Sequence, residues 1–229
     1  LLQKCANNSN SNMDTRLINI QVLIWDFDGT LYKPHPDLWR DVREAEYRVI
    51  AEHTGWEKEK VIEEFTKLYK VVLASATQVV AKLAEIQVKQ AAIEMENYYD
   101  RTKYLRPDDK LVELFTKLAH LKHYLLVNGI QKKIVEALAV LGLSESLFAE
   151  IVTSETVGDN KPSPKGFLYI LEKTGLSLEQ HLMIGDRIDV DLEPAKKIGM
   201  KTCLVWSVTS HPSVDVTIPT VYDVANLVG

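Results

Sequence analysis

The chain has 229 residues, of which 46% are hydrophobic and 26% are charged, and its formal net charge at pH 7 is −5. This composition is typical of a soluble globular protein with one core, or with one core and a small second lobe, and it excludes a collagenous, low-complexity or wholly disordered chain. With 27 Lys and Arg against 32 Asp and Glu, the chain has no overall positive field that would attract nucleic acid.

The N-terminal residues do not match a secretory signal. Residues 1–17 begin with an Asn- and Ser-rich stretch that lacks the apolar core of a secretory signal, so we interpret them as a disordered tail or an expression remnant. Cys5 and Cys203 form neither a disulfide framework nor a zinc-binding pattern, which fits a reducing cytoplasm. No run approaches the ~18 apolar residues of a membrane span. We therefore expect a cytoplasmic protein without a membrane partner.

Short apolar runs that end in small or acidic residues are the strongest structural signal in the chain. Such runs are typical of strands buried on both faces, as in a parallel sheet that is covered by helices. They occur at 20–25, 124–127, 151–152, 182–184 and 202–206. Amphipathic stretches of helical spacing lie between the later runs, at 109–121, 132–141 and 164–174. This alternation predicts an α/β fold, a Rossmann-like doubly wound parallel sheet.

One segment, residues 37–101, breaks this alternation because it carries only helical signals. The helices predicted there span 37–54, 57–74 and 77–100. They are too many for a single connection between two strands. We therefore predict an inserted, all-helical cap at residues 34–105, and an α/β core made of residues 18–33 and 106–229.

Two acidic residues follow the first predicted strand, in the sequence Asp26-Phe27-Asp28-Gly29-Thr30. In an open parallel sheet, ligands bind beyond the carboxyl ends of the strands. Carboxylates two positions apart on extended backbone project to the same side, and they repel each other unless a cation or a shared proton lies between them. Taken alone, this pentapeptide is equally compatible with an ordinary turn at the end of a strand.

Further charged residues at the same predicted edge favour the functional interpretation. Asp186, Asp189 and Asp191 follow the fourth predicted strand, and Lys161 lies among turn residues before a helix. An ammonium group beside several carboxylates and a divalent cation can balance the charge of a phosphoryl group, while one carboxylate attacks phosphorus. Lys161 alone would be interpreted as a solvated loop lysine. Together, these residues indicate phosphoryl-transfer chemistry.

The order of these motifs resembles that of the haloacid dehalogenase (HAD) superfamily of phosphohydrolases. The four motifs are DFDGT (26–30), VNG (127–129), KPSP (161–164) and GDRIDVD (185–191). The resemblance covers about residues 19–228, and the predicted cap lies where many members of the family carry one. It implies a Mg²⁺-dependent phosphatase that hydrolyses a small phosphorylated metabolite through an aspartyl-phosphate intermediate.

The resemblance also implies a role for each matching residue. Asp26 would be the nucleophile, and Asp28 would be the general acid and then the base that activates water. Lys161 would bridge the nucleophile and the phosphate. The Mg²⁺ ligands would be the carboxylate of Asp26, the main-chain carbonyl of Asp28, and Asp186. Asp191 would orient a metal-bound water or Lys161.

The substrate phosphate would contact the first and second motifs as well as the lysine. The residues implied for this contact are Gly29, Thr30, Asn128, Gly129 and Lys161. Within the family, Asp28 favours phosphate transfer over dehalogenation, because cleavage of a carbon–halogen bond leaves no oxygen to protonate. Phosphomutase relatives keep both aspartates, so a phosphomutase is one alternative, although we cannot match His35 or Lys33 to the cap-side residues that those relatives use.

One position departs from the pattern of the family. Its second motif normally ends the strand with Ser or Thr, whose hydroxyl donates to the phosphate, whereas Val127 has no donor. Loss of such a charge-assisted hydrogen bond is worth about 1.5–3 kcal/mol. The amide of Asn128 and nearby main-chain N–H groups are candidates for compensation. A second alternative is therefore a catalytically attenuated phosphate-binding protein. Phosphoglycolate, nucleoside monophosphates and sugar phosphates all fit the motifs as substrates, and no motif indicates an oligomeric state.

Overall fold

The computed structural model describes residues 17–72 and 75–228. The predicted tail lies outside these residues except for Leu17. The N–H of Leu17 donates to the carbonyl of Leu227 over 2.8 Å, and the Leu17 side chain packs against the main core. Leu17 is therefore in contact with the core, while the predicted domain bounds stay a prediction.

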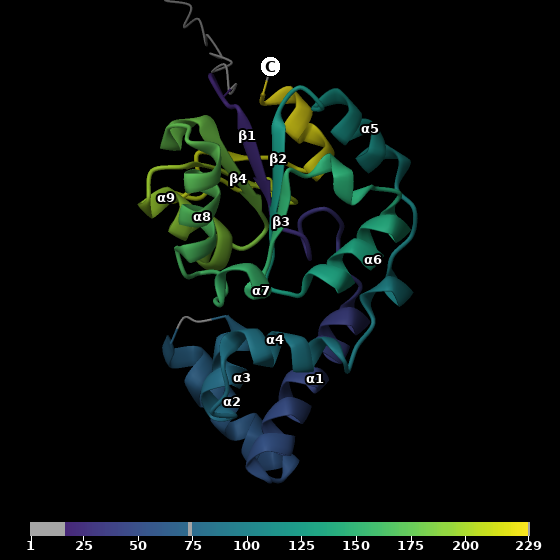
Figure 1. The fold of residues 1–229 in the computed structure, drawn as a ribbon, viewed down its shortest axis with the longest axis vertical. Coiled ribbons are helices and arrows are strands. Elements are labelled where there is room, and N and C mark those ends of the chain that lie inside the picture. Colours follow the sequence, from purple (N-terminus) through teal and green to yellow (C-terminus); the bar gives the residue numbers. More distant parts are fainter. Residues whose placement is uncertain (1–16, 73–74, 229) are drawn as a thin grey trace, which may run out of the picture.

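A six-stranded parallel sheet forms the centre of the upper lobe in Figure 1. Its strands are β1 (Val22–Trp25), β2 (Lys122–Leu126), β3 (Glu150–Val152), β4 (His181–Gly185), β5 (Lys201–Leu204) and β6 (Val216–Thr217). The strand order is β3-β2-β1-β4-β5-β6, and every pair of neighbours is parallel. The predicted α/β fold is confirmed, while β6 is a two-residue edge strand that the apolar pattern did not reveal.

Helices cover both faces of this sheet, as expected for a doubly wound fold. They are α5 (Asp109–Lys117), α6 (Gln131–Leu141), α7 (Ser154–Val157), α8 (Lys165–Thr174) and α9 (Glu193–Lys197). Side chains alternate along β1: Leu23 and Trp25 pack with α5 and α6, and Val22 and Ile24 pack with α8 and α9. Each face of the central strand therefore has a separate apolar core.

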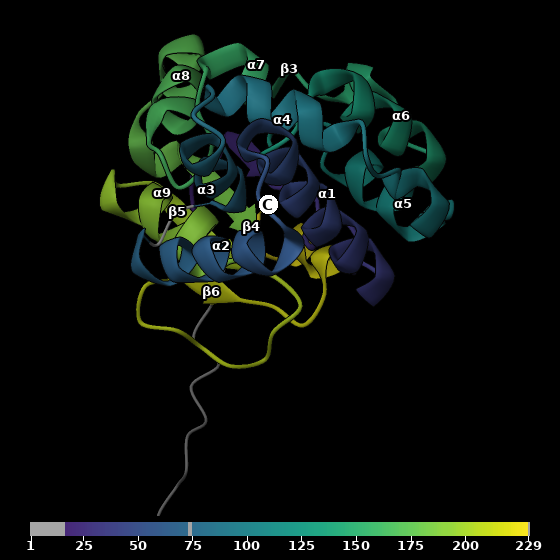
Figure 2. The same ribbon diagram turned by 90° about the horizontal axis from the view of Figure 1, so that it is seen from below.

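A second group of helices, which we call the helical lobe (residues 36–96), lies beyond the carboxyl ends of the strands (Figure 1). Its helices are α1 (Pro36–Thr54), α2 (Lys58–Val72), α3 (Ala76–Leu83) and α4 (Val88–Glu96). They pack around a core of their own, in which Val49, Ile50 and Phe65 are buried. Seen from below, these helices lie in front of the sheet (Figure 2). None of the described helices is long and apolar enough to cross a bilayer.

The helix that we predicted over 77–100 is two helices, so this prediction was wrong. Glu85 adopts a left-handed conformation with φ 55°, and the N–H of Ile86 bonds back to the carbonyl of Ala81 over 3.0 Å. This closure ends α3, and the chain reverses before α4. The apolar periodicity continues across the break because α3 and α4 face the same core.

The first helix of the lobe ends at Gly55, which has φ 68° and donates its N–H to the carbonyl of Ala51. A Cβ at Gly55 would meet no described atom within 4 Å, so a substitution there tests backbone conformation alone. We expect Gly55→Ala to lower the free energy of unfolding by about 1 kcal/mol, measured by urea denaturation. Gly55→Asn should lose less, because asparagine tolerates this conformation. Equal losses in the two variants would contradict this explanation.

Candidate active site

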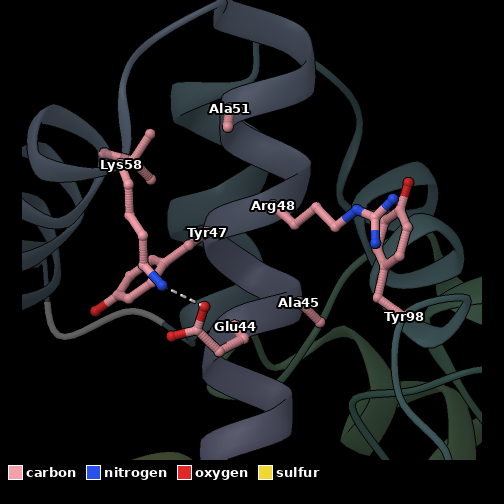
Figure 3. A pocket seen from close by; sticks show the side chains of 8 residues that line it. Glu44, Ala45, Tyr47, Arg48, Ala51, Lys58 and Tyr98 are labelled. Atoms are coloured by element: carbon pink, nitrogen blue, oxygen red, sulfur yellow. Dashed lines mark hydrogen bonds and ion pairs between the residues drawn. The ribbon is translucent and has the colours of Figure 1, made fainter.

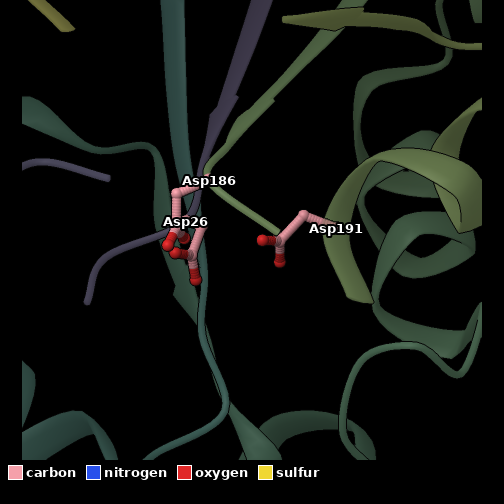
Figure 4. Close-up of side chains that lie close together, drawn as sticks. All are labelled: Asp26, Asp186 and Asp191. Carbon is pink, nitrogen blue, oxygen red and sulfur yellow. The ribbon is translucent and has the colours of Figure 1, made fainter. Parts of the chain in front are cut away.

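Three carboxylates meet at the carboxyl ends of β1 and β4 (Figure 4). Asp26 follows β1, Asp186 follows β4, and Asp191 lies on the π-helical turn Ile188–Leu192. One carboxylate oxygen from each of the three residues lies within 4.8 Å of the other two. The strand order reverses at β1, with β2 on one side and β4 on the other, which is where open parallel sheets bind ligands. The fold therefore joins acidic residues from two distant motifs.

Lys161 provides the cation of this cluster. Its Nζ lies 2.6 Å from Oδ1 of Asp26 and 2.7 Å from Oδ1 of Asp191. Burial alone would lower the pKa of Lys161, but the charges of Asp191 and Asp26 outweigh burial and raise it. The other oxygen of Asp191 accepts from the main-chain N–H of Arg187 over 3.2 Å. Both oxygens of Asp191 are thus used within the protein, as expected for a residue that orients Lys161.

Asn128 fixes the backbone that carries the lysine. Its Nδ2 donates to the carbonyl of Lys161 over 2.9 Å, and its Oδ1 accepts from the N–H of Lys161 over 2.8 Å. Both ends of this amide are bonded to the backbone of Lys161, so Asn128 positions that residue, and the phosphate contact that we expected of Asn128 stays a prediction. Gly129 lies on the wall of the site, where a Cβ would stand only 3.0 Å from Oε1 of Glu96.

Gly29 and Thr30 shape the acidic cluster and do not line the cavity. Gly29 has φ 94°, and a Cβ there would lie 2.4 Å from Oδ2 of Asp186. The buried Thr30 hydroxyl donates to Oδ2 of Asp26 over 2.9 Å and lies 3.4 Å from Oδ1 of Asp186. Both residues therefore lie against the carboxylates, and the substrate contacts that we expected of them stay predictions.

The electrostatics of the cluster fit a bound divalent cation. Burial, together with the charges of Asp26 and Asp191, raises the pKa of Asp186 to about 8. Burial also raises the pKa of Asp191 to about 6, although Lys161 opposes this shift. A divalent cation would relieve the repulsion between these carboxylates, and their oxygens are the donors that Mg²⁺ prefers. Asp26, Asp186 and Asp191 together therefore offer oxygen atoms that could hold a metal.

Asp28 lies beside this cluster and is held by two residues that the sequence motifs do not mark. The hydroxyl of Tyr32 donates to Oδ1 of Asp28, and Nη2 of Arg101 lies 3.3 Å from Oδ2. Arg101 begins the short turn Arg101–Tyr104, which leads from the helical lobe towards α5. Only the tertiary fold brings Arg101 to Asp28, so no local pattern in the sequence could have identified it.

A cavity of about 100 Å³ lies between these residues and the helical lobe. Asp26, Asp28 and Lys161 line it from the core. The side chains that line it from the helical lobe include Trp39, Val42, Ser75, Thr77 and Met95. Gln78 fastens the lobe to the core, because its Nε2 donates to Oδ1 of Asp159 and to the carbonyl of Asn160 over 3.1 and 3.2 Å. The lobe therefore covers the carboxylates and the lysine.

A larger cavity of about 390 Å³ lies along α1 in the helical lobe (Figure 3). Its charged side chains interact with their neighbours: Nζ of Lys58 lies 2.7 Å from Oε2 of Glu44, and the guanidinium of Arg48 lies 4.1 Å from the ring centre of Tyr98. None of the motif residues lines this cavity. The smaller cavity is therefore the candidate active site.

Comparison with known proteins agrees with this geometry. A model of the haloacid dehalogenase-like hydrolase family matches residues 20–199. The chain is 28% identical over 194 residues to glyceraldehyde 3-phosphate phosphatase of Methanopyrus kandleri, covering 80% of this chain and 82% of that protein. It is 27% identical over 195 residues to phosphoglycolate phosphatase of Aquifex aeolicus, covering 82% and 85%. The crystal structure of a HAD phosphatase from Thermococcus onnurineus matches with a TM-score of 0.60 at 21% identity, covering 90% of this chain and 96% of that one.

The family match spans most of the chain, so the protein belongs to the haloacid dehalogenase-like hydrolases. This membership confirms the resemblance seen in the four motifs. It also confirms that the protein is an enzyme of the hydrolase class, and the structural match agrees with the α/β fold described above.

One acidic residue of the cavity wall, Glu46 on α1, predicts a pH dependence of stability. Glu46 is 3% exposed, and burial raises its pKa to about 7 despite the nearby charges of Arg43 and Arg187. Because the folded state favours the protonated carboxyl, this stabilising contribution is full below pH 4.5 and is lost as the pH rises to about 7.

We expect Glu46→Gln to remove this dependence. Between pH 5 and 8, wild type should lose stability relative to the variant, by on the order of 3 kcal/mol, in urea denaturation at each pH. Glu44→Gln is the matched control, because Glu44 is an exposed residue of the same helix. Parallel pH profiles for wild type and Glu46→Gln would contradict the prediction.

Proposed function

We propose that this protein is a Mg²⁺-dependent phosphatase that hydrolyses a small phosphorylated metabolite through an aspartyl-phosphate intermediate. The observation that carries the proposal is the buried contact of Lys161 with Asp26 and Asp191, beside Asp186 and beneath the helical lobe. Similarity to a glyceraldehyde 3-phosphate phosphatase and a phosphoglycolate phosphatase supports the same reaction class. The cytoplasmic location expected from the sequence stays a prediction.

Asp26 is the nucleophile in this proposal. Contacts with Thr30 and Lys161 hold its two oxygens in fixed positions, so little reorganisation precedes attack on phosphorus. The new bond joins an oxygen of Asp26 to phosphorus as the bond to the ester oxygen breaks. Lys161 offsets the negative charge of the phosphoryl group. A Mg²⁺ ion held by Asp26 and Asp186 would supply a Lewis acid for that charge.

Asp28 moves the protons in both halves of the reaction. It first donates a proton to the leaving oxygen, and then accepts a proton from the water that hydrolyses the aspartyl-phosphate. Tyr32 and Arg101 hold its carboxyl group at the edge of the cavity. The helical lobe excludes bulk water from the first step.

The size of the cavity favours a substrate with a short carbon skeleton. About 100 Å³ is available between the carboxylates and the helical lobe, and the apolar walls include Trp39, Val42 and Met95. The two relatives described above are named for phosphate esters of glyceraldehyde and glycolate, which have short carbon skeletons. We therefore propose a phosphate ester of a few carbons as the substrate.

The first test is release of phosphate from p-nitrophenyl phosphate and from a panel of phosphoglycolate, glyceraldehyde 3-phosphate and hexose phosphates. We expect turnover with Mg²⁺, none with EDTA, and a loss of at least about 10³-fold in kcat for Asp26→Asn. Asp189→Asn is the control, because Asp189 belongs to the same acidic motif as Asp186 but is exposed. Full activity of Asp26→Asn would refute the assigned nucleophile, and isomerised sugar phosphate without free phosphate would indicate a phosphomutase.

The second test concerns Val127, which lines the cavity at the end of β2 without a hydrogen-bond donor. We expect Val127→Thr to raise kcat/KM by about tenfold, because a hydroxyl would donate to the phosphate at an almost unchanged side-chain volume. Val127→Ala, which adds no donor, should bring no gain. Turnover that appears only in Val127→Thr would favour the attenuated phosphate-binding protein. No gain from threonine would show that other donors already satisfy the phosphate.

A further inference from the structure

A buried ionic cluster connects the helical lobe to Asp28. Nη2 of Arg101 lies 2.7 Å from Oε1 of Glu96, 2.8 Å from the hydroxyl of Tyr99 and 3.3 Å from Oδ2 of Asp28. Arg101 and Glu96 are each 3% exposed. An ion pair so far removed from water contributes little net stability, because desolvation offsets the attraction of its charges. Its position beside Asp28 therefore calls for a functional explanation.

The cluster stands where the lobe rejoins the core. Glu96 is the last residue of α4, and Arg101 opens the turn that follows. A Cβ at Gly129 would lie 3.0 Å from Oε1 of Glu96 and 3.9 Å from Nη2 of Arg101, so the cluster also packs against the second motif. A displacement of α4 would carry Glu96, and with it the guanidinium of Arg101, away from the core.

Arg101 reaches Asp28 through a single nitrogen. Its Nε and Nη1 are buried and have no hydrogen-bond partner among the described residues. Nη2 donates its two hydrogens to Glu96 and Tyr99, so Arg101 acts on Oδ2 of Asp28 as a fixed, buried positive charge 3.3 Å away. Because the hydroxyl of Tyr32 donates to Oδ1 of Asp28, contacts at both oxygens fix the rotation of this carboxyl group.

We propose that Arg101 is a positioning residue that aligns the carboxyl group of Asp28 with the leaving oxygen while the helical lobe covers the site. This inference rests on the proposed function, because it requires Asp28 to protonate a leaving group. In that step the bond between phosphorus and the ester oxygen breaks, and its electron pair stays on that oxygen. The oxygen takes the proton of Asp28, and the electrons of the O–H bond stay on the carboxylate.

A comparison of leaving groups tests this role. p-Nitrophenolate departs without a proton, whereas an alkoxide needs one, and kcat/KM reports only the steps up to the departure of the leaving group. In Arg101→Met, we expect kcat/KM for phosphoglycolate or glycerol phosphate to fall at least about tenfold, and kcat/KM for p-nitrophenyl phosphate to stay within about threefold, since general acid catalysis contributes ~10²–10⁴-fold. Arg106→Met, an exposed arginine of the same connection, should change neither value.

A double-mutant cycle with Asp28→Asn separates positioning from a structural role. Once the acid is absent, Arg101→Met should cause no further selective loss on the alkyl phosphate. Because Arg101→Met leaves Glu96 buried without its partner, the variant Arg101→Met/Glu96→Gln, whose melting is followed by circular dichroism, is made in parallel. It should show the same selective loss at an unchanged melting temperature.

Two results would overturn the inference: an equal loss on both substrates in the folded variants, or a further selective loss in the Asp28→Asn background. Both are distinct from failure of the proposed function. That failure would appear as no hydrolysis of p-nitrophenyl phosphate or of any alkyl phosphate by wild type with Mg²⁺.

Discussion

The buried contact between the ammonium group of Lys161 and the carboxylates of Asp26 and Asp191 is the interaction on which the rest of the site depends. Three aspartates at one end of a parallel sheet would repel one another strongly in a poorly hydrated environment. Lys161 offsets part of that repulsion, and Asn128 holds its backbone through both ends of one amide. Burial and the charges of Asp26 and Asp191 still raise the pKa of Asp186, and a divalent cation at this point would relieve that repulsion.

The helical lobe covers the acidic cluster and is also bonded to the segment that carries Lys161. Gln78 bonds to Asp159 and to the carbonyl of Asn160, the two residues that precede Lys161. Arg101 also extends from the end of the lobe to Asp28. The lobe is therefore fastened beside the residues that carry charge and protons, so its position and the geometry of the site are mechanically linked.

The sequence alone was enough to predict most of the core, because strands buried on both faces must be nearly continuous apolar runs, and four motifs at strand ends must converge. It could not predict β6, whose two residues lie at the edge of the sheet, or the break at Glu85, where the apolar period continues through a reversal of the chain. The contact of Arg101 with Asp28 was also out of reach, because it exists only in the tertiary fold. Thr30 was identified from its motif, but a motif does not reveal which way a hydroxyl points.

The tight packing at Gly29 limits how this protein can evolve. Every replacement of glycine adds a Cβ, and here that atom would lie 2.4 Å from a carboxylate oxygen of Asp186 on backbone with φ 94°. Every single substitution at this position is therefore expected to disturb the acidic cluster. A lineage could lose Gly29 only together with a displacement of Asp186, and so only by giving up the present arrangement of the acidic cluster. Gly29 is therefore constrained both by its own backbone conformation and by its contact with Asp186.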